Sequence, residues 1–158
     1  MPGLPDDRGL PRVPGLLEVT TIVVTAAVIE EAGRFLVTRR QPGVHLEGYW
    51  EFPGGKCEAG ETHAECLARE LDEELGVEAT IGAELFATIH AYADRRVELH
   101  FLRCAIHGAP VARLGQEIHW VSRAELATLP FPPADAELIR RLTLNERQVD
   151  DGSRPAAD

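Results

Sequence analysis

The sequence predicts an α+β domain in which a mixed β-sheet is packed between helices, an α-β-α sandwich. Segments rich in β-branched residues recur along the chain, and helical segments interrupt them without regular alternation. The 158 residues, 44% hydrophobic and 27% charged, have the size and composition of one globular unit. We expect this domain over residues 18–146, with a flexible arm at 1–17 and a flexible tail at 147–158.

The first strands are expected on either side of a short turn. Residues 19–29 are dominated by β-branched side chains, and after the turn signal at 30–33 a second strand-like segment covers 34–40, so the two predict a hairpin. Residues 49–52 form a short aromatic strand. Pro53 should end it, because proline cannot donate to a strand ladder, and the two glycines that follow favour a turn.

The strongest helix signal covers Glu61–Leu75. Apolar or small residues recur there at the spacing of one helix face, namely Ala64, Leu67, Ala68, Leu71 and Leu75. Gly76 follows in the position that glycine favours after a helix. This segment therefore predicts an amphipathic helix with its apolar side towards the core.

The second half of the chain predicts a further set of mixed elements. A polar turn at 93–96 separates two strands, and Ser122 with Glu125 three residues later forms a capping box. The expected elements are strands at 79–91, 97–106 and 118–121, a short helix at 122–129 and a last helix at 133–144.

Charge and hydropathy exclude several kinds of partner. The 26 acidic residues exceed the 16 basic ones and give a net charge of −10, which repels nucleic-acid polymers and anionic membranes. The longest apolar segment, residues 19–29, is too short to span a bilayer. The N-terminus lacks a secretory signal pattern, so we expect a cytoplasmic protein. For the oligomeric state we expect a monomer or a homodimer.

The cysteines predict neither a disulfide framework nor a zinc site. Cys57, Cys66 and Cys104 are odd in number and have no C-x-x-C spacing. We therefore expect reduced thiols without a chemical role.

Three carboxylates crowd one face of the predicted helix. Glu70, Glu73 and Glu74 stand at i, i+3 and i+4, and the last two lie where the helix dipole favours cations. Like charges at this spacing destabilise a helix, and a bound divalent cation would compensate for them. The alternative is a solvated acidic face on an acidic protein.

The spacing around these carboxylates matches a known motif. Gly55, Glu61 and the segment 69–77 (RELDEELGV) fit the pattern G-x5-E-x7-R-E-U-x-E-E-x-G-U, in which U is aliphatic. This pattern resembles the Nudix box and is far more specific than a single glycine motif. The resemblance implies a Nudix fold and one or more Mg²⁺ ions, with Mn²⁺ as a possible substitute.

The resemblance also implies roles for the residues of the motif. Glu70, Glu73, Glu74 and the carbonyl of Gly54 would hold the metal, and Glu70 matches the usual candidate for the base that activates water. Glu61 and Arg69 would orient the set, since a guanidinium pairs with carboxylates in a bidentate manner.

The reaction implied is hydrolysis of a nucleoside triphosphate to a monophosphate and pyrophosphate. This reaction would remove modified nucleotides from the nucleotide pool. A second possibility within the family is hydrolysis of ADP-ribose or another nucleoside diphosphate linked to a group X. A possibility from another class is a nucleotide-sensing binding module on the same fold, although such modules often have damaged boxes and this box is intact.

Beyond the box, the chain has further matching segments at residues 38–40 with His45, 50–56, 94–96 and 131–135. With them it resembles the MutT-type branch, which acts on oxidised purine nucleotides. The resemblance implies these substrate-binding residues: Arg40, Phe52, Gly55, Lys56, Arg95 and Asp135. Arg40 matches a phosphate contact, while Phe52 and Arg95 match residues beside the base. The alternatives are a surface arginine, a core phenylalanine and a charge at a hairpin tip.

Two positions depart from that branch. Asp135 stands where the oxidised-guanine enzymes carry asparagine, whereas related cytidine-triphosphate and methylated-cytidine enzymes carry aspartate. An ionised aspartate only accepts hydrogen bonds, but a buried and protonated one could also donate, so both 8-oxo-dGTP and CTP or 5-methyl-dCTP stay open. Asp135 could also cap the last helix. Leu114 occupies the place of a frequent metal-binding glutamate, and Glu117 is a nearby substitute.

Overall fold

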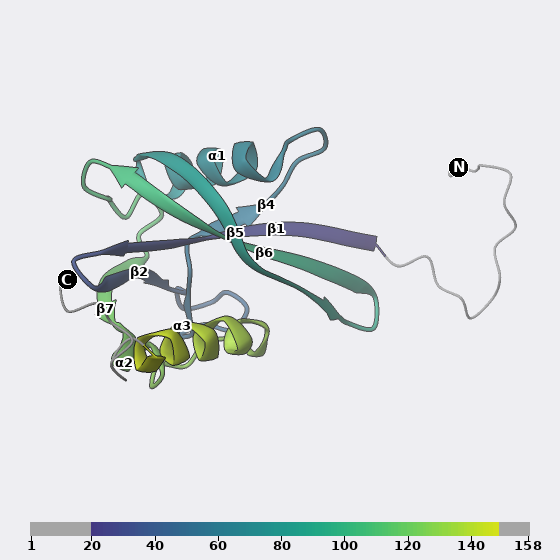
Figure 1. Cartoon of the computed structure of the whole chain (residues 1–158). Helices are drawn as coiled ribbons and strands as arrows, with labels where there is room; N and C mark the ends of the chain where they lie inside the picture. The colour runs from purple at the N-terminus through teal and green to yellow at the C-terminus, as the bar shows by residue number, and fades with distance from the viewer. Residues whose placement is uncertain (1–19, 149–158) are drawn as a thin grey trace, which may run out of the picture.

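A computed structural model describes residues 20–148 and shows a mixed sheet between two helical layers (Figure 1). The predicted arm at 1–17 lies outside the described residues, as does the chain from 149 onward. The elements in chain order are β1 Thr20–Glu31, β2 Arg34–Arg39, β3 Trp50–Glu51, β4 Gly54–Lys56, α1 His63–Leu75, β5 Glu78–Ala91, β6 Arg95–His107, β7 Glu117–Ser122, α2 Arg123–Leu126, the 3-10 turn η2 Pro133–Asp135 and α3 Ala136–Gln148.

The sheet is centred on β1. This strand pairs in parallel with β6 from Thr20 to Ile29, and antiparallel with β4 and with the start of β2. β5 and β6 form a long antiparallel hairpin, and β2 also pairs with β3 and β7. The predicted mixed sheet is therefore confirmed, but most of β1 pairs with β6, which is distant in sequence, and only its last two residues form the hairpin with β2.

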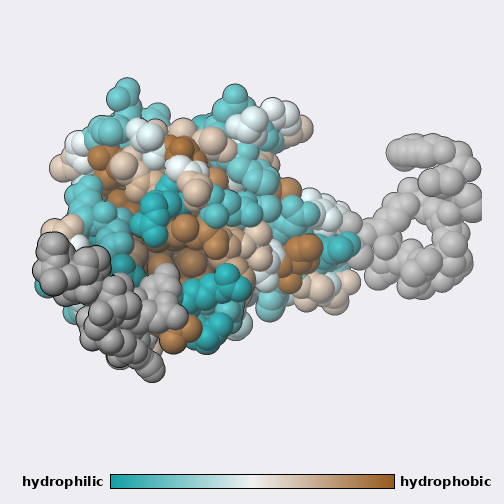
Figure 2. Space-filling view, in the orientation of Figure 1, coloured by the Kyte–Doolittle hydropathy of each residue, from teal (hydrophilic) through white to brown (hydrophobic). Residues whose placement is uncertain are grey.

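Strand alternation divides the core between the two faces of the sheet. On β1, Ala27 and Ile29 pack with Leu67 and Leu71 of α1. Their neighbours on the strand point the other way, into a second cluster that includes Leu138 of α3. Helix α1 covers one face and α2 with α3 the other, as Figure 1 shows. In Figure 2, apolar surface gathers over the middle of the same view, between α1 and α3.

Helix α1 ends at the predicted residue but begins later than expected. Thr62 caps it and forms a capping box with Glu65, so the helix begins at His63, two residues after the expected start. Gly76 adopts the left-handed conformation, and its N–H donates to the carbonyl of Asp72. The predicted leucines of the apolar face are fully buried, whereas Ala64 is exposed.

The prediction of a turn at the two glycines after Pro53 is wrong, because both belong to strand β4. Gly54 pairs with Ala26 of β1 and has φ of 156°, and a Cβ there would collide with the carbonyl of Thr25. Glycine lets β4 approach β1 this closely. The aromatic strand before it is correspondingly short and comprises only Trp50–Glu51.

The two C-terminal helices have different bounds from those expected. α2 ends at Leu126, three residues before the predicted end, and α3 continues to Gln148, four residues beyond Leu144. None of the helices in the described part is both long and apolar enough to cross a membrane.

Candidate active site

The C-terminal half of α1 lies against the two glycines of β4. The Glu70 carboxyl occupies the space beside Gly55 where any larger residue would place its Cβ, so such a residue would displace the Glu70 side chain. The N–H of Gly54 donates to Oε1 of Glu74 over 3.4 Å. The fold thus brings together Gly54, Gly55, Glu70 and Glu74, four residues predicted from the sequence.

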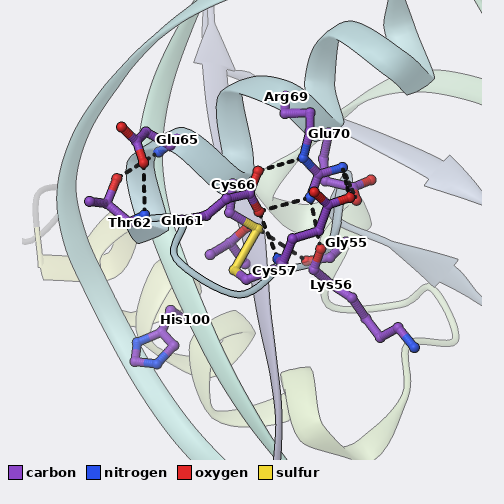
Figure 3. The surroundings of a disulfide bond; sticks show 12 residues. Gly55, Lys56, Cys57, Glu61, Thr62, Glu65, Cys66, Arg69, Glu70 and His100 are labelled. Carbon is purple, nitrogen blue, oxygen red and sulfur yellow. Dashed lines mark hydrogen bonds and ion pairs between the residues drawn. A yellow bond between two sulfur atoms is a disulfide. The ribbon is translucent and has the colours of Figure 1, made fainter.

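Arg69 connects the other carboxylates of the motif (Figure 3). Its Nε and Nη2 donate to the two carboxylate oxygens of Glu61 over 2.6 and 3.0 Å, a bidentate pair. Its Nη1 donates to Glu70 over 3.1 Å and to Glu73 over 3.3 Å, and Nη2 also donates to the carbonyl of Lys56 over 3.0 Å. The geometry supports the orienting role expected for Arg69 and Glu61.

The carboxyl groups of the motif differ strongly in pKa. The hydrogen bonds from Arg69 and from the Glu58 backbone lower the pKa of Glu61 to about 2. Burial, followed by repulsion from Glu70 and Glu51, raises the pKa of Glu74 to about 8. Burial also raises the pKa of Glu70, although Arg69 opposes this. One guanidinium cannot neutralise all these acids, and Glu74 is the one left without a basic partner among the described residues.

A disulfide links Cys57 and Cys66 beside this network (Figure 3). It joins the end of β4 to the first turns of α1, with the two Cα atoms 5.1 Å apart. The expectation that these cysteines are reduced is therefore wrong for this structure. A disulfide needs spatial closeness and not C-x-x-C spacing, and here the packing of α1 on β4 supplies the closeness. Cys104 is a free, buried thiol.

A small cleft opens between the motif and strand β2. It has a volume of about 120 Å³, and its lining includes Arg40, Glu51, Glu74 and Gln116. Arg40 is one of these lining residues and pairs with Glu51 through Nη1 over 2.8 Å. The predicted phosphate-binding arginine is thus placed beside a predicted metal ligand.

Phe52 and Asp135 lie on the opposite side of the sheet from α1. Phe52 is buried and stacks on Phe131 with the ring centres 5.3 Å apart. The Asp135 side chain is also buried, and burial together with repulsion from Glu51 raises its pKa to about 7. Within the described part of the chain it accepts no helix-capping hydrogen bond, so the capping alternative finds no support.

Three predicted site residues are not brought into contact with the carboxylate cluster. Arg95 lies at the tip of the β5–β6 hairpin, where it pairs with Asp94 and lies over the ring of Tyr92. Glu117 pairs with Arg39 over 3.4 Å and lines a separate pocket with it. Lys56 offers its carbonyl to Arg69, but its side chain is exposed (Figure 3).

Sequence reasoning missed Glu51 and Gln116. Glu51 stands between the buried aromatic residues Trp50 and Phe52, and this alternation could have placed its carboxylate on the other side of the chain. The side-chain amide of Gln116 donates to the carbonyl of Glu74 over 3.2 Å. No sequence pattern connects residues so far apart.

Comparison with known proteins identifies the family. A model of the NUDIX domain matches residues 24–141, which cover most of the described chain. The chain belongs to the Nudix hydrolase family. Among curated relatives, an 8-oxo-dGTP diphosphatase of Haemophilus influenzae is 41% identical over 128 residues, which are 79% of this chain and 93% of the relative. A CTP pyrophosphohydrolase of Escherichia coli K12 is 38% identical over 119 residues, or 75% and 88% of the two chains.

Solved structures agree with this Nudix assignment. The solution structure of the E. coli ORF135 protein matches with a TM-score of 0.73 at 34% identity, over 87% of this chain and 96% of that one. The crystal structure of a MutT protein from Methanosarcina mazei Go1 matches with a TM-score of 0.70 at 25% identity, over 83% and 98%. The predicted family, MutT-like branch, fold and enzyme class are confirmed.

Proposed function

We propose that this Nudix hydrolase is a Mg²⁺-dependent nucleoside triphosphate pyrophosphohydrolase that releases a monophosphate and pyrophosphate. The observation that carries the proposal is the pair of half-buried carboxylates, Glu70 and Glu74, held against the glycines of β4. A buried acid without a basic partner is costly unless a cation completes its surroundings. The arrangement is therefore suited to hard divalent cations.

The residues present fit such a cation. Glu70, Glu73 and Glu74 would supply oxygen ligands, and the glycine backbone of β4 lies directly beside Glu70 and Glu74. Mg²⁺ keeps several waters and substrate phosphates among its ligands, which suits a site with few protein oxygens. Bound there, the ions supply charge neutralisation to the phosphates and order the reacting groups.

The protein side chains then have distinct tasks. Glu70, whose pKa is raised by burial, accepts a proton from the attacking water as the new P–O bond forms and the anhydride P–O bond breaks. Pyrophosphate leaves with the electron pair of the broken bond. Arg69 holds Glu61 and Glu73 in place through its hydrogen bonds. Arg40 binds a phosphate at the cleft, in exchange for its pairing with Glu51.

We propose that the base is recognised on the Phe52 side of the sheet by Asp135. A protonated Asp135 both donates and accepts hydrogen bonds, as an asparagine amide does, whereas the ionised form only accepts. Its pKa of about 7 makes both forms accessible near neutrality. The relatives named for 8-oxo-dGTP and for CTP support substrates of these two kinds, modified purine or cytosine triphosphates.

The catalytic proposal is tested by pyrophosphate release with Mg²⁺ from a panel of 8-oxo-dGTP, dGTP, CTP, dCTP and 5-methyl-dCTP. We expect turnover of at least one of them and a loss of about 10²-fold or more in kcat for Glu70→Gln. The matched control is Asp72→Asn, an exposed acid on the same helix, which should retain activity. Absence of turnover across the panel with tight nucleotide binding would favour the sensing module, and turnover of ADP-ribose alone would favour the second Nudix reaction.

The base assignment is tested separately with Asp135→Asn. This variant should shift the ratio of kcat/KM towards 8-oxo-dGTP and away from cytosine nucleotides, because the amide always donates. An unchanged ratio would show that Asp135 does not contact the base.

A further inference from the structure

A second group of potential metal ligands lies at the start of α1. His63 on α1, Glu84 on β5 and His100 on β6 each bring one ligand atom to within 4.8 Å of the other two. The rings of His63 and His100 lie 4.0 Å apart between centres. Two imidazoles and a carboxylate from three separate elements therefore converge on one point.

Both ring nitrogens of His100 face carboxylate oxygens. Its Nδ1 lies 2.7 Å from Oε1 of Glu84, and its Nε2 lies 3.3 Å from Oε1 of Glu98 on the same strand. A metal-binding histidine usually donates its second ring N–H to a carboxylate, which fixes the ring and its tautomer. With Nδ1 towards the metal, Nε2–H donates to Glu98. The ring is well enclosed, since the His100 side chain is 15% exposed.

The charge around these residues favours a cation. Within the described part of the chain, Glu84 and Glu98 have His100 as their ion-pair partner and no lysine or arginine. Two carboxylates beside imidazoles that are neutral in their metal-binding form leave a net negative charge. This charge offsets the helix dipole, which is unfavourable for a cation at the first residue of α1.

We propose that His63, Glu84 and His100 bind a zinc-class dication, with Glu98 as the orienting partner of His100. Two imidazole nitrogens and one carboxylate oxygen form a common ligand set for Zn²⁺, whereas Mg²⁺ prefers oxygen ligands. Zinc bonds of about 2.0–2.1 Å require ligand atoms roughly 3.3 Å apart in a tetrahedron. The Glu84–His100 pair has only to open slightly, His63 closes towards it, and a water completes the tetrahedron.

This site is distinct from the catalytic carboxylates. His63 precedes Glu70 by seven residues, which is about 10 Å along the helix axis. In Figure 3, the His100 ring lies outside the hydrogen-bond network of Arg69. A metal here joins the start of α1 to β5 and β6, and it steadies the segment 57–62 that carries Glu61.

The test is a calorimetric Zn²⁺ titration of the full chain in a large excess of Mg²⁺, without thiol reductant. Mg²⁺ occupies the carboxylate site, and the intact disulfide withholds the thiolates of Cys57 and Cys66, which lie near Glu61. We expect one equivalent of Zn²⁺ to bind. His63→Asn and His100→Asn should each weaken this binding at least roughly tenfold. Glu98→Gln should weaken it less, because Glu98 does not touch the metal.

The matched control is His107→Asn. His107 lies on the same strand β6, and within the part of the chain that the structure describes its ring bonds to the hydroxyl of Thr80, so its loss should leave Zn²⁺ binding unchanged. Co²⁺ substitution gives a second readout, because a tetrahedral site with nitrogen ligands produces an intense visible spectrum. Absence of Zn²⁺ binding to the wild-type chain overturns the proposal and leaves a hydrogen-bonded His–Glu pair. Equal binding by the His63 and His100 variants also overturns it, by placing the metal elsewhere.

Discussion

Glu61 and Glu74 lie at opposite ends of the α1 segment and have opposite electrostatic environments. Glu61 is held by both arms of the Arg69 guanidinium, and its pKa falls to about 2. Glu74 receives one backbone hydrogen bond from Gly54, and its pKa rises to about 8. A glutamate therefore has a basic partner at one end of the segment and, among the described residues, none at the other.

The difference separates the structural part of the motif from its reactive part. At the N-terminal end, the capping box, the Cys57–Cys66 disulfide and the Arg69–Glu61 pair satisfy the local groups within the protein. At the C-terminal end, burial and mutual repulsion favour the protonated form of Glu74, and its ionised form has no basic partner among the described residues. Strain of this kind is expected where function compensates for it.

The largest expected effect comes from neutralising the two glutamates in turn. Glu74→Gln should lower kcat/KM by about 10²–10³-fold, because a group that neutralises the transition state is lost. The same change should stabilise the metal-free protein above pH 8, since the buried charge disappears. Glu61→Gln should do the reverse: it destabilises the fold by removing the bidentate partner of Arg69, with a smaller loss of activity. Steady-state kinetics and urea unfolding measure both quantities.

Asp72→Asn provides the common reference for both variants, as an exposed position on the same helix. If Glu74→Gln destabilised the metal-free protein, or if Glu61→Gln cost more activity than Glu74→Gln, the proposed division between the two ends would be wrong.

A smaller effect is expected from pH in the absence of metal. The folded protein keeps a proton on Glu74 up to about pH 8 and on Asp135 up to about pH 7, whereas their ordinary pKa values are 4.5 and 3.8. Between those limits the folded state holds more protons than the unfolded state, so stability falls as pH rises. We expect the free energy of unfolding to decrease by about 3 kcal/mol or more from about pH 5 to about pH 8.

Mg²⁺ should reduce this decrease, because it stabilises the ionised form of Glu74 in the folded state. The lowered pKa of Glu61 does not interfere, since its contribution is lost only below its ordinary value of 4.5. Urea unfolding at several pH values, with and without Mg²⁺, measures both slopes. A stability that rises with pH in metal-free buffer would contradict the environment assigned to Glu74.

Contacts between residues close in the sequence were the ones that could be predicted. The leucine face and the Gly76 terminus of α1, like the capping box of Ser122 and Glu125, depend on residues within a few positions of one another, and all three are confirmed. Within the motif, fixed spacing on one helix was enough to group Glu70, Glu73 and Glu74 with Arg69.

Contacts between distant elements could not be predicted in this way. Strand β4 exists because Gly54 fits against β1, and that approach depends on the register between the strands. The Cys57–Cys66 disulfide and the Glu51–Glu74 repulsion likewise need the packed fold, since nothing in the spacing of these residues indicates proximity. Glu117 was expected as a metal ligand because it lies close in sequence to Leu114, but in the fold its carboxylate pairs with Arg39.

The smallest effect should come from opening the disulfide, which belongs to the structurally complete end of the motif. The link joins residues only nine positions apart in the sequence, so its removal should lower the free energy of unfolding by about 2 kcal/mol. The full chain has three cysteines, so a thiol titration of the denatured protein should count one thiol before reduction and three after.

Thermal unfolding of the oxidised, reduced and Cys57→Ser/Cys66→Ser forms measures the loss in stability, and initial rates at saturating Mg²⁺ measure activity. We expect a lower Tm with kcat within a fewfold of the oxidised protein, because neither sulfur contacts Glu70 or Glu74. A kcat loss as large as that of Glu74→Gln would show instead that the covalent link positions the reactive carboxylates, and the two ends of the motif would then act as one unit.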